Sequence, residues 1–156
     1  MIVTAMIETP KGSNQKFDYD PEEKCFKLSK ILPAGMAFPF DFGMIPETRG
    51  EDGDPLDIIV ISEGFAFPGC LVDCRVIGAL QAEQTERNGD KVRNDRFIGI
   101  PEVSHLFSEI RTLEELPEMI TSELEAFFKN YNEQAGKKFK VTGRLSAGEA
   151  AKILKR

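Results

Sequence analysis

Short apolar runs of strand length follow one another through the first two thirds of the chain, and one long amphipathic segment comes after them. Residues 2–8 and 15–19 alternate apolar and polar side chains, the pattern of half-buried strands. Further strands are expected at residues 24–28, 56–62, 70–80 and 96–100, and Asn88-Gly89 predicts a hairpin turn. Strands first and helices last favour a closed or strongly curved antiparallel sheet with helices packed outside.

The last third of the chain carries the helical pattern. Its apolar side chains recur at spacings that place them on one helix face, at Ile120, Leu124, Phe127, Phe128 and Tyr131. Pro117 suits the first turn of this helix, and Gly136 suits its end. A strand over residues 137–143 and a short helix over 146–155, which opens with a capping box, complete the expected elements.

Length and composition indicate one soluble domain over residues 1–156. A chain with 41% hydrophobic residues can bury a core without disulfide bonds. Its net charge of −6 disfavours nucleic acid and anionic membranes as partners. No apolar run approaches the roughly 18 residues of a membrane span, and the N-terminus is expected to be a first strand rather than a signal peptide. We therefore expect a cytoplasmic protein.

Cysteine and histidine are too few for several kinds of site. The three cysteines, with no CxxC pair, argue against a disulfide framework or a zinc cluster, and we expect them to be small buried residues. The one histidine, His105, lies in a polar turn and is expected at the surface. A mechanism that depends on histidine is therefore disfavoured.

The stretch EDGDPLDIIVISE, residues 51–63, places Asp52, Asp54 and Asp57 directly before an apolar strand. Two carboxylates about 4 Å apart repel each other by roughly 4 kcal/mol at an effective dielectric constant of 20, so the cluster needs compensation. Solvent supplies it in an ordinary acidic loop. Here, however, Gly53 and Pro55 make a tight, stiff turn. Such a turn predicts a site for a hard cation, Mg²⁺ or Mn²⁺. An EF-hand is rejected, because Asp57 would occupy the position that must be glycine.

Other charged residues on predicted strands and loops could complete such a site. Acids could hold metal and bases could hold phosphate oxygens; the candidates are Glu8, Lys16, Asp18, Lys30, Arg93, Asn94, Asp95, Arg96, Lys137 and Lys138.

At these positions the sequence resembles the soluble family I inorganic pyrophosphatases. DGDPLDIIV is similar to that family's signature, Asp-x-Asp-Pro-x-Asp followed by apolar residues. Three further stretches resemble the family: IETPKGSNQKFDYD, LPAGMAFPFDFGMIPET and ELEAFFKNYNEQAGKKFKVTG. The resemblance extends from about Val3 to the C-terminus.

The resemblance implies a mainly β (α+β) fold, a small closed β-barrel of the OB type with flanking C-terminal helices. It implies Mg²⁺-dependent hydrolysis of inorganic pyrophosphate to two orthophosphates by a metal-activated water, with Mn²⁺ as a substitute ion. It also implies a homo-oligomer, either a dimer or a hexamer.

The resemblance also implies a role for each candidate residue. Asp54 would be the general base. The metal ligands would be Asp52 and Asp57, with Glu8 and Asp18 in an outer shell and Asp95 as a further ligand. Phosphate oxygens would be held by Lys16, Lys30, Arg96, Tyr131 and Lys137.

Several positions depart from the family pattern. Lys30 stands where most members have arginine, and phenylalanines stand where they have tyrosines, at Phe38 and Phe42. Each lost hydroxyl removes a hydrogen bond worth roughly 0.5–1.5 kcal/mol. Asp18 replaces a longer Glu, and Asn132 replaces a lysine.

The stretch RNDR, residues 93–96, departs furthest. If Arg96 replaces the family's lysine, Asn94 stands in the aspartate position. Asp95 would face the other side of a regular strand, and only a bulge or a twist at the strand start would bring it in. The ligand is therefore either Asp95 or Asn94, and the acid expected in the preceding hairpin is either Glu83 or Asp90.

These departures leave two alternatives to a pyrophosphatase. The chain could be a divergent member with altered phosphoanhydride preference, for a nucleoside diphosphate or a short polyphosphate. It could instead be a weakly active or non-catalytic OB-type module that binds a polyanion.

Overall fold

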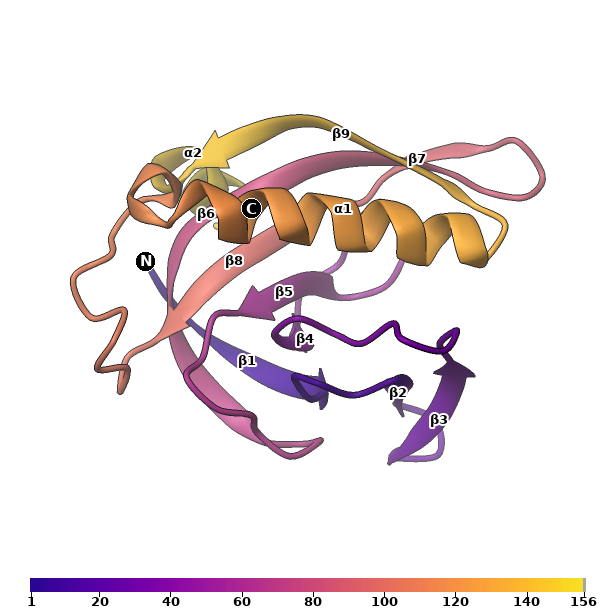
Figure 1. Cartoon of the computed structure of the whole chain (residues 1–156), viewed down its shortest axis with the longest axis horizontal. Coiled ribbons are helices and arrows are strands. Elements are labelled where there is room, and N and C mark those ends of the chain that lie inside the picture. The colour runs from indigo at the N-terminus through magenta and orange to yellow at the C-terminus, as the bar shows by residue number, and fades with distance from the viewer. Residues whose placement is uncertain (156) are drawn as a thin grey trace.

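A computed structural model describes residues 1–155 of the chain (Figure 1). Its strands are β1 (Ile2–Thr9), β2 (Gln15–Asp20), β3 (Cys25–Ile31), β4 (Asp41–Ile45), β5 (Leu56–Val60), β6 (Leu71–Thr85), β7 (Lys91–Arg93), β8 (Arg96–Pro101) and β9 (Lys138–Ser146). Its helices are the 3-10 turn η1 (Leu113–Glu115), α1 (Glu118–Gln134) and α2 (Ala147–Leu154). The strands and helices expected from periodicity are therefore present.

Five strands close into a ring in the order β1, β4, β5, β8 and β6, with β6 pairing back to β1. This ring confirms the expected closed sheet. The expectation that every pair would be antiparallel is wrong at β5 and β8, which run parallel. After β5 the chain forms β6 and β7 and then returns as β8, which pairs with the free edge of β5 in the same direction.

Strand β6 holds the rest of the sheet together. It is longer than the predicted residues 70–80 and continues to Thr85, so its first part pairs with β1 and β8 and its second part with β7 and β9. The register with β8 shifts between Val76 and Gly78. A Cβ at Gly78 would lie 2.6 Å from the carbonyl oxygen of Leu145, so glycine allows β9 to pack closely at this bend.

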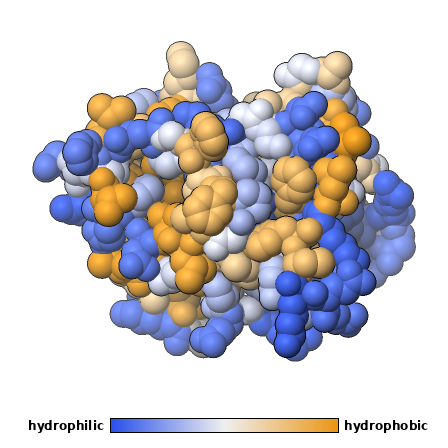
Figure 2. Space-filling model, turned by 90° about the horizontal axis from the view of Figure 1, so that it is seen from below, coloured by the Kyte–Doolittle hydropathy of each residue, from blue (hydrophilic) through white to orange (hydrophobic). Residues whose placement is uncertain are grey.

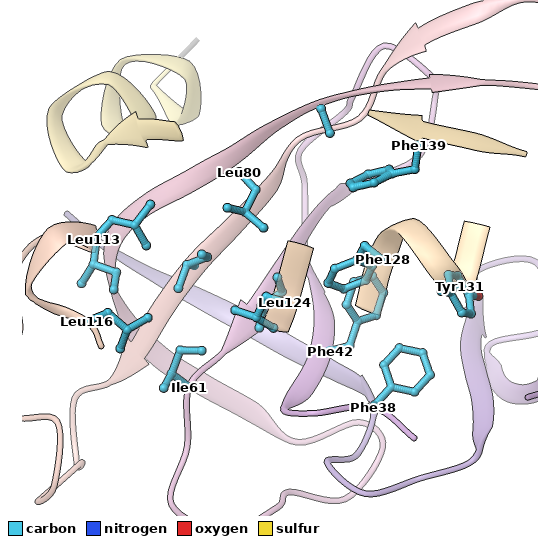
Figure 3. Packing of buried hydrophobic residues seen from close by; sticks show 14 of the residues in the cluster. Phe38, Phe42, Ile61, Leu80, Leu113, Leu116, Leu124, Phe128, Tyr131 and Phe139 are labelled. Atoms are coloured by element: carbon cyan, nitrogen blue, oxygen red, sulfur yellow. The ribbon is translucent and has the colours of Figure 1, made fainter. Parts of the chain in front are cut away.

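The two faces of β5 enter two hydrophobic clusters. Ile59 and Ile61 pack toward α1, whereas Ile58 and Val60 pack on the other side with Ala150 of α2. In the cluster under α1, Phe38, Phe42, Phe128 and Tyr131 gather at one end and Leu113, Leu116 and Ile61 at the other (Figure 3). Because side chains alternate along a strand, Asp57 shares the α1 side of β5 with Ile59.

The helix ends follow the expected signals. Pro117 immediately precedes α1, and Gly136 follows it with a φ of 76°, a conformation that favours glycine. The predicted capping box of α2 is confirmed, because Ser146 and Glu149 bond each other's backbone N–H groups. Figure 1 shows α1 lying across the sheet, with its C-terminal end between the β6–β7 hairpin and the β2–β3 ribbon.

The expectation of three buried cysteines is confirmed only at Cys74. Cys25 is exposed on β3 and Cys70 is half-buried, and all three cysteines are free thiols. His105 is exposed, as expected. Figure 2 shows hydrophobic and hydrophilic residues interspersed on the lower face of the molecule. In residues 1–155, no helix is long and apolar enough to cross a membrane.

Candidate active site

A cavity of about 590 Å³ opens beside β5, under the second half of α1. Six carboxylates line it: Glu8, Asp18, Asp52, Asp54, Asp57 and, on the opposite wall, Glu86. Four basic side chains and two tyrosines also line it: Lys16, Lys30, Arg96, Lys137, Tyr19 and Tyr131. The structure therefore brings together ten of the eleven candidate site residues, from both ends of the sequence.

The turn that carries Asp52 and Asp54 is closed by its own backbone. The N–H of Gly50 donates to the carbonyl oxygen of Asp54 at 2.7 Å, and the N–H of Asp54 donates to Asp52 Oδ1 at 3.0 Å. Gly53 has a φ of 90°, which a residue with a Cβ rarely adopts. These bonds hold the two carboxylates at the mouth of the cavity. Asp57 follows as the second residue of strand β5.

Three of the acids are held in an environment that disfavours their charge. Burial raises the pKa of Glu8 to about 7, although the N–H of Tyr19 donates to its Oε2 at 2.8 Å. Burial also raises the pKa of Asp57, against the lowering effect of Arg96. The pKa of Asp54 is raised by desolvation and by the charges of Asp52 and Asp18. A bound cation would stabilise the charged form of all three carboxylates.

Aromatic rings support the cations opposite these acids. Lys30 Nζ lies 5.0 Å from the centre of the Tyr131 ring, and Arg96 Cζ lies 5.1 Å from that of Phe128. Arg96 Nη1 also lies 3.1 Å from Asp57 Oδ2. Arg96 Nε and the Tyr131 hydroxyl are buried without a hydrogen-bond partner in residues 1–155. Both are donors available to an anionic ligand.

Phe38 and Phe42 also line the cavity, where the family pattern has tyrosines. Both are buried in the aromatic cluster, and Phe38 packs against Phe127 and Tyr131 with ring centres 5.0 and 5.7 Å apart. Lys16 Nζ lies 5.8 Å from the centre of the Phe42 ring. These two rings therefore act as an apolar floor rather than as hydroxyl donors.

The structure does not bring Asp95 into the acidic cavity, although Asp52 lines both that cavity and the one that Asp95 lines. Asp95 Oδ1 accepts from the N–H of Ala82 at 3.1 Å, and its Oδ2 lies 2.8 Å from Arg93 Nε. Asp95 lines only a separate cavity behind the turn, whereas Asn94 lines both that cavity and the acidic one. The physical reason is strand alternation: no bulge intervenes, so Asn94 and Arg96 share one side and Asp95 takes the other.

The hairpin residue in the cavity is neither of the two that the sequence favoured. Glu83 faces Lys91, and Asp90 accepts from the Asn88 side chain at the hairpin tip. Instead Gln84 and Glu86 line the cavity. The signal for them was the alternation of Leu80 and Ala82, both buried, because the same side of β6 continues to Gln84.

A chain of hydrogen bonds joins these polar residues. Asn94 Nδ2 donates to Gln84 Oε1 at 3.1 Å, and Gln84 Nε2 donates to Glu86 Oε1 at 3.1 Å. Lys137 Nζ lies 3.1 Å from Glu86 Oε2. Asn132 is buried in the same wall, and its amide donates to the carbonyl oxygen of Phe128. Neutral amides and one ion pair thus form the wall opposite the aspartates.

The donor set fits a hard divalent cation by its chemistry, because carboxylate oxygens are the preferred ligands of Mg²⁺. The acids are not drawn together as a finished metal cage: residues 1–155 contain no group of three or more His, Cys, Asp or Glu close enough to hold an ion. Asp57 is paired with Arg96, and Asp18 with Lys16. A metal would therefore bind by drawing these carboxylates away from their basic partners.

Comparison with known proteins agrees with this geometry. A family model described as inorganic pyrophosphatase matches residues 5–156. The chain is 37% identical over 153 residues to an inorganic pyrophosphatase of Geobacillus stearothermophilus, covering 98% of this chain and 90% of that protein. It is 40% identical over 158 residues to an inorganic pyrophosphatase of Nanoarchaeum equitans, covering 99% and 94%.

Solved structures show the same likeness in three dimensions. The crystal structure of inorganic pyrophosphatase from Thermus thermophilus superposes with a TM-score of 0.89 at 34% identity, covering 99% of this chain and 87% of that one. A structure of an inorganic pyrophosphatase from Neisseria gonorrhoeae gives 0.89 at 29% identity, covering 99% and 87%. The chain belongs to the inorganic pyrophosphatase family.

Proposed function

We propose that this protein hydrolyses inorganic pyrophosphate to two orthophosphates. The observation that carries the proposal is the division of one cavity into a carboxylate side and a basic side. Pyrophosphate is almost entirely negative charge, so its hydrolysis needs an activated water at one phosphorus and cations at the oxygens of both phosphoryl groups.

The carboxylate side would hold the metal. Asp52 and Asp57 are the proposed direct ligands, and Glu8 and Asp18 the outer ones. When bound, Mg²⁺, or Mn²⁺ in its place, would lower the pKa of a water and neutralise phosphate oxygens. Burial raises the pKa values of Glu8 and Asp57, which supports this assignment because a bound cation would stabilise the charged form of both carboxylates.

Asp54 is the proposed general base. It lies on the rigid turn between Asp52 and Asp57 and has no basic partner in residues 1–155. Its pKa is raised by desolvation and by the charges of Asp52 and Asp18, which makes it a better proton acceptor than an isolated aspartate. Its place in the turn would let it take a proton from a water aimed at the substrate.

The basic side would orient the substrate. Arg96 and Tyr131 offer unpartnered buried donors, and Lys16, Lys30 and Lys137 supply charge. Asn94, rather than Asp95, is the proposed contact to the bound phosphate or a metal, because only Asn94 lines the acidic cavity.

The protein's surroundings are proposed by the same reasoning. We propose a cytoplasmic location, which accords with the three free thiols. We also propose a homo-oligomer, either a dimer or a hexamer, as membership of the family implies.

The test is phosphate release from pyrophosphate with and without millimolar Mg²⁺, by wild type and by Asp54→Asn. Because the variant keeps the shape of the turn but loses the base, we expect turnover to fall by about 10²–10⁴-fold. Asp90→Asn, at the exposed hairpin tip, is the matched control and should retain activity.

Each alternative predicts a different result. A non-catalytic polyanion-binding module would bind pyrophosphate with Mg²⁺ and release no phosphate from folded wild type. A member with altered preference would release phosphate faster from a nucleoside diphosphate or another phosphoanhydride than from pyrophosphate. Equal turnover by wild type and Asp54→Asn would remove Asp54 from the mechanism.

A further inference from the structure

Four residues in the wall of the acidic cavity, Gln84, Glu86, Asn94 and Lys137, form a continuous chain of polar contacts, and we refer to them as the amide wall. Gln84 lies near the end of β6, and Glu86 lies just after it. Asn94 lies between β7 and β8, and Lys137 between α1 and β9. Gln84 is 5% exposed and is bonded to a neighbour on each side, so it is the centre of the chain.

The direction of the hydrogen bonds in the amide wall is set by Glu86. An ionised carboxylate only accepts, so the amide nitrogen of Gln84 must face it, and lies 3.1 Å from Glu86 Oε1. The Gln84 oxygen then faces Asn94, whose own amide nitrogen donates to it at 3.1 Å. One acid therefore holds both amides in a single orientation.

The amide wall has no spare negative charge. Both oxygens of Glu86 are engaged, Oε1 by Gln84 and Oε2 by Lys137 Nζ at 3.1 Å. The Gln84 oxygen already accepts from Asn94, so Asn94 Oδ1 is the one side-chain oxygen of the wall without a donor in residues 1–155. One acid is thus balanced by one base. On the turn, by contrast, Asp52 has no basic partner within the same residues.

A divalent cation would gain little from contact with such a wall. Mg²⁺ gives up its waters reluctantly and is held in proteins through carboxylates and substrate phosphates. The oxygen of Asn94 is neutral, so it offers no charge in exchange for a lost water. A cation held by the aspartates would therefore keep its water on the side that faces the amide wall.

We propose that the amide wall is closed to direct metal ligation, and that Gln84 is the residue that keeps it closed. This chain would then bind its divalent cations on the carboxylate side alone. The proposal rests on the function proposed above, and it assigns Asn94 to the substrate rather than to a metal, because an amide nitrogen has a second N–H to donate to a phosphate oxygen.

The special place of Gln84 follows from what a glutamate of the same shape would do there. An oxygen in place of its amide nitrogen would face Glu86 Oε1 with like charge. A divalent cation between the two carboxylates would relieve that repulsion. An aspartate in place of Asn94 would have the same effect, because its oxygen would face the oxygen of Gln84. One amide nitrogen at either position therefore decides whether the wall attracts a metal.

The experiment counts the Mn²⁺ ions bound per chain by isothermal titration calorimetry, on the full chain without substrate. Gln84→Glu and Asn94→Asp each place a second carboxylate in the amide wall, and circular dichroism checks that each variant is folded. Asn94→Ala removes the wall oxygen that has no donor. Gln81→Glu is the matched control, because it makes the same chemical change on the same strand at a residue that does not line the acidic cavity.

We expect Gln84→Glu and Asn94→Asp each to bind one more Mn²⁺ per chain than wild type does. Gln81→Glu and Asn94→Ala should bind the same number as wild type. Asn94→Ala should nevertheless raise KM for pyrophosphate by about fivefold, the effect of losing one neutral hydrogen bond to the substrate.

One Mn²⁺ fewer in Asn94→Ala would overturn the inference, because the wall would then supply a metal ligand. An unchanged count in the folded acidic variants would also overturn it, because the neutral amides would not be what excludes the ion. The same is true of an extra ion in Gln81→Glu, since any added carboxylate would then recruit Mn²⁺. Failure of wild type to release phosphate from pyrophosphate would instead overturn the proposed function, and the ion counts are measured independently of it.

Discussion

At the scale of single residues, the buried carboxylate of Asp57 is paired with the guanidinium group of Arg96. Asp57 lies near the start of a buried strand, and Arg96 Nη1 lies 3.1 Å from its Oδ2. Arg96 is itself 4% exposed and lies over the rings of Phe128 and Phe139. Burying two charges costs more than their attraction returns unless other groups complete the arrangement. Among the residues that the structure describes, Arg96 Nε has no hydrogen-bond partner, so the pair is arranged for a ligand rather than for stability alone.

The buried carboxyl of Glu8 should make the stability of the fold depend on pH. Its pKa is raised from 4.5 to about 7, so the folded protein binds a proton more tightly than the unfolded chain does. In metal-free protein, stability should therefore fall as pH rises from about 4.5 to about 7. Glu8→Gln keeps an acceptor for the Tyr19 N–H and removes this dependence. Above pH 7 it should be more stable than wild type by up to ~3 kcal/mol, and near pH 4.5 about equal.

The measurement is urea unfolding at pH 5 and pH 8 in a chelator, with Glu22→Gln on the exposed β2–β3 turn as the control. Added Mg²⁺ should shrink the advantage of the variant at pH 8, because the cation would stabilise ionised Glu8 in wild type. An advantage that is the same at both pH values would show that Glu8 does not carry the pH dependence.

At the scale of elements, periodicity was enough to predict most strands and both helices, because one face of each is buried and the other is not. It did not predict how far β6 continues, since residues 81–85 are polar on one side and pair with β7 and β9 on both edges. Because β6 is longer than predicted, Glu86 lines the cavity, and Glu83 and Asp90 lie outside it. Tertiary pairing, which no local pattern contains, decided that part of the site.

The side on which Asp95 lies was decided by the same kind of information. The sequence showed Asn94 and Asp95 side by side and allowed either to face the acids. Only the register of β8 against β5, in which Asp57 is opposite Arg96, fixes which one does. By contrast, the aspartate turn was predictable, because Gly53 and Pro55 shape it locally.

The seam between β1 and β4 offers a prediction at this scale. A Cβ at Gly43 would lie 2.2 Å from the carbonyl oxygen of Met6, so Gly43→Ala must push the two strands apart. We expect it to lower the free energy of unfolding by about 1–3 kcal/mol, the usual cost of overpacking. It should also weaken activity, because the neighbours Glu8 and Phe42 line the cavity.

Gly64→Ala is the matched control for chemical denaturation and phosphate release, because a Cβ there meets nothing within 4 Å. Its stability should remain within about 0.5 kcal/mol of wild type. Gly43→Ala with wild-type stability would mean that the two strands separate without cost, and that the ring is less tightly closed at this seam.

At the scale of the whole molecule, the cavity is built from both ends of the sequence: Glu8 comes from β1, the aspartates from the middle, and Tyr131 and Lys137 from the end of α1 and the residues after it. A ligand that neutralises the acids therefore joins parts that are distant in the chain, and only the folded chain offers them together. Such a ligand stabilises the fold by about 2.7 kcal/mol when present at 100 times its Kd.

We therefore expect millimolar Mg²⁺ to raise the melting temperature of wild type, measured by calorimetry against a chelator. Asp52→Asn should lose much of that rise, because it removes a proposed direct ligand. Asp54→Asn should keep most of it while losing turnover, since Asp54 is the proposed base rather than a ligand. Asp90→Asn controls for the loss of one negative charge. If Mg²⁺ left the melting temperature of wild type unchanged even at saturating concentration, the carboxylate side would not be a metal site, and the water would have to be activated by Asp54 alone.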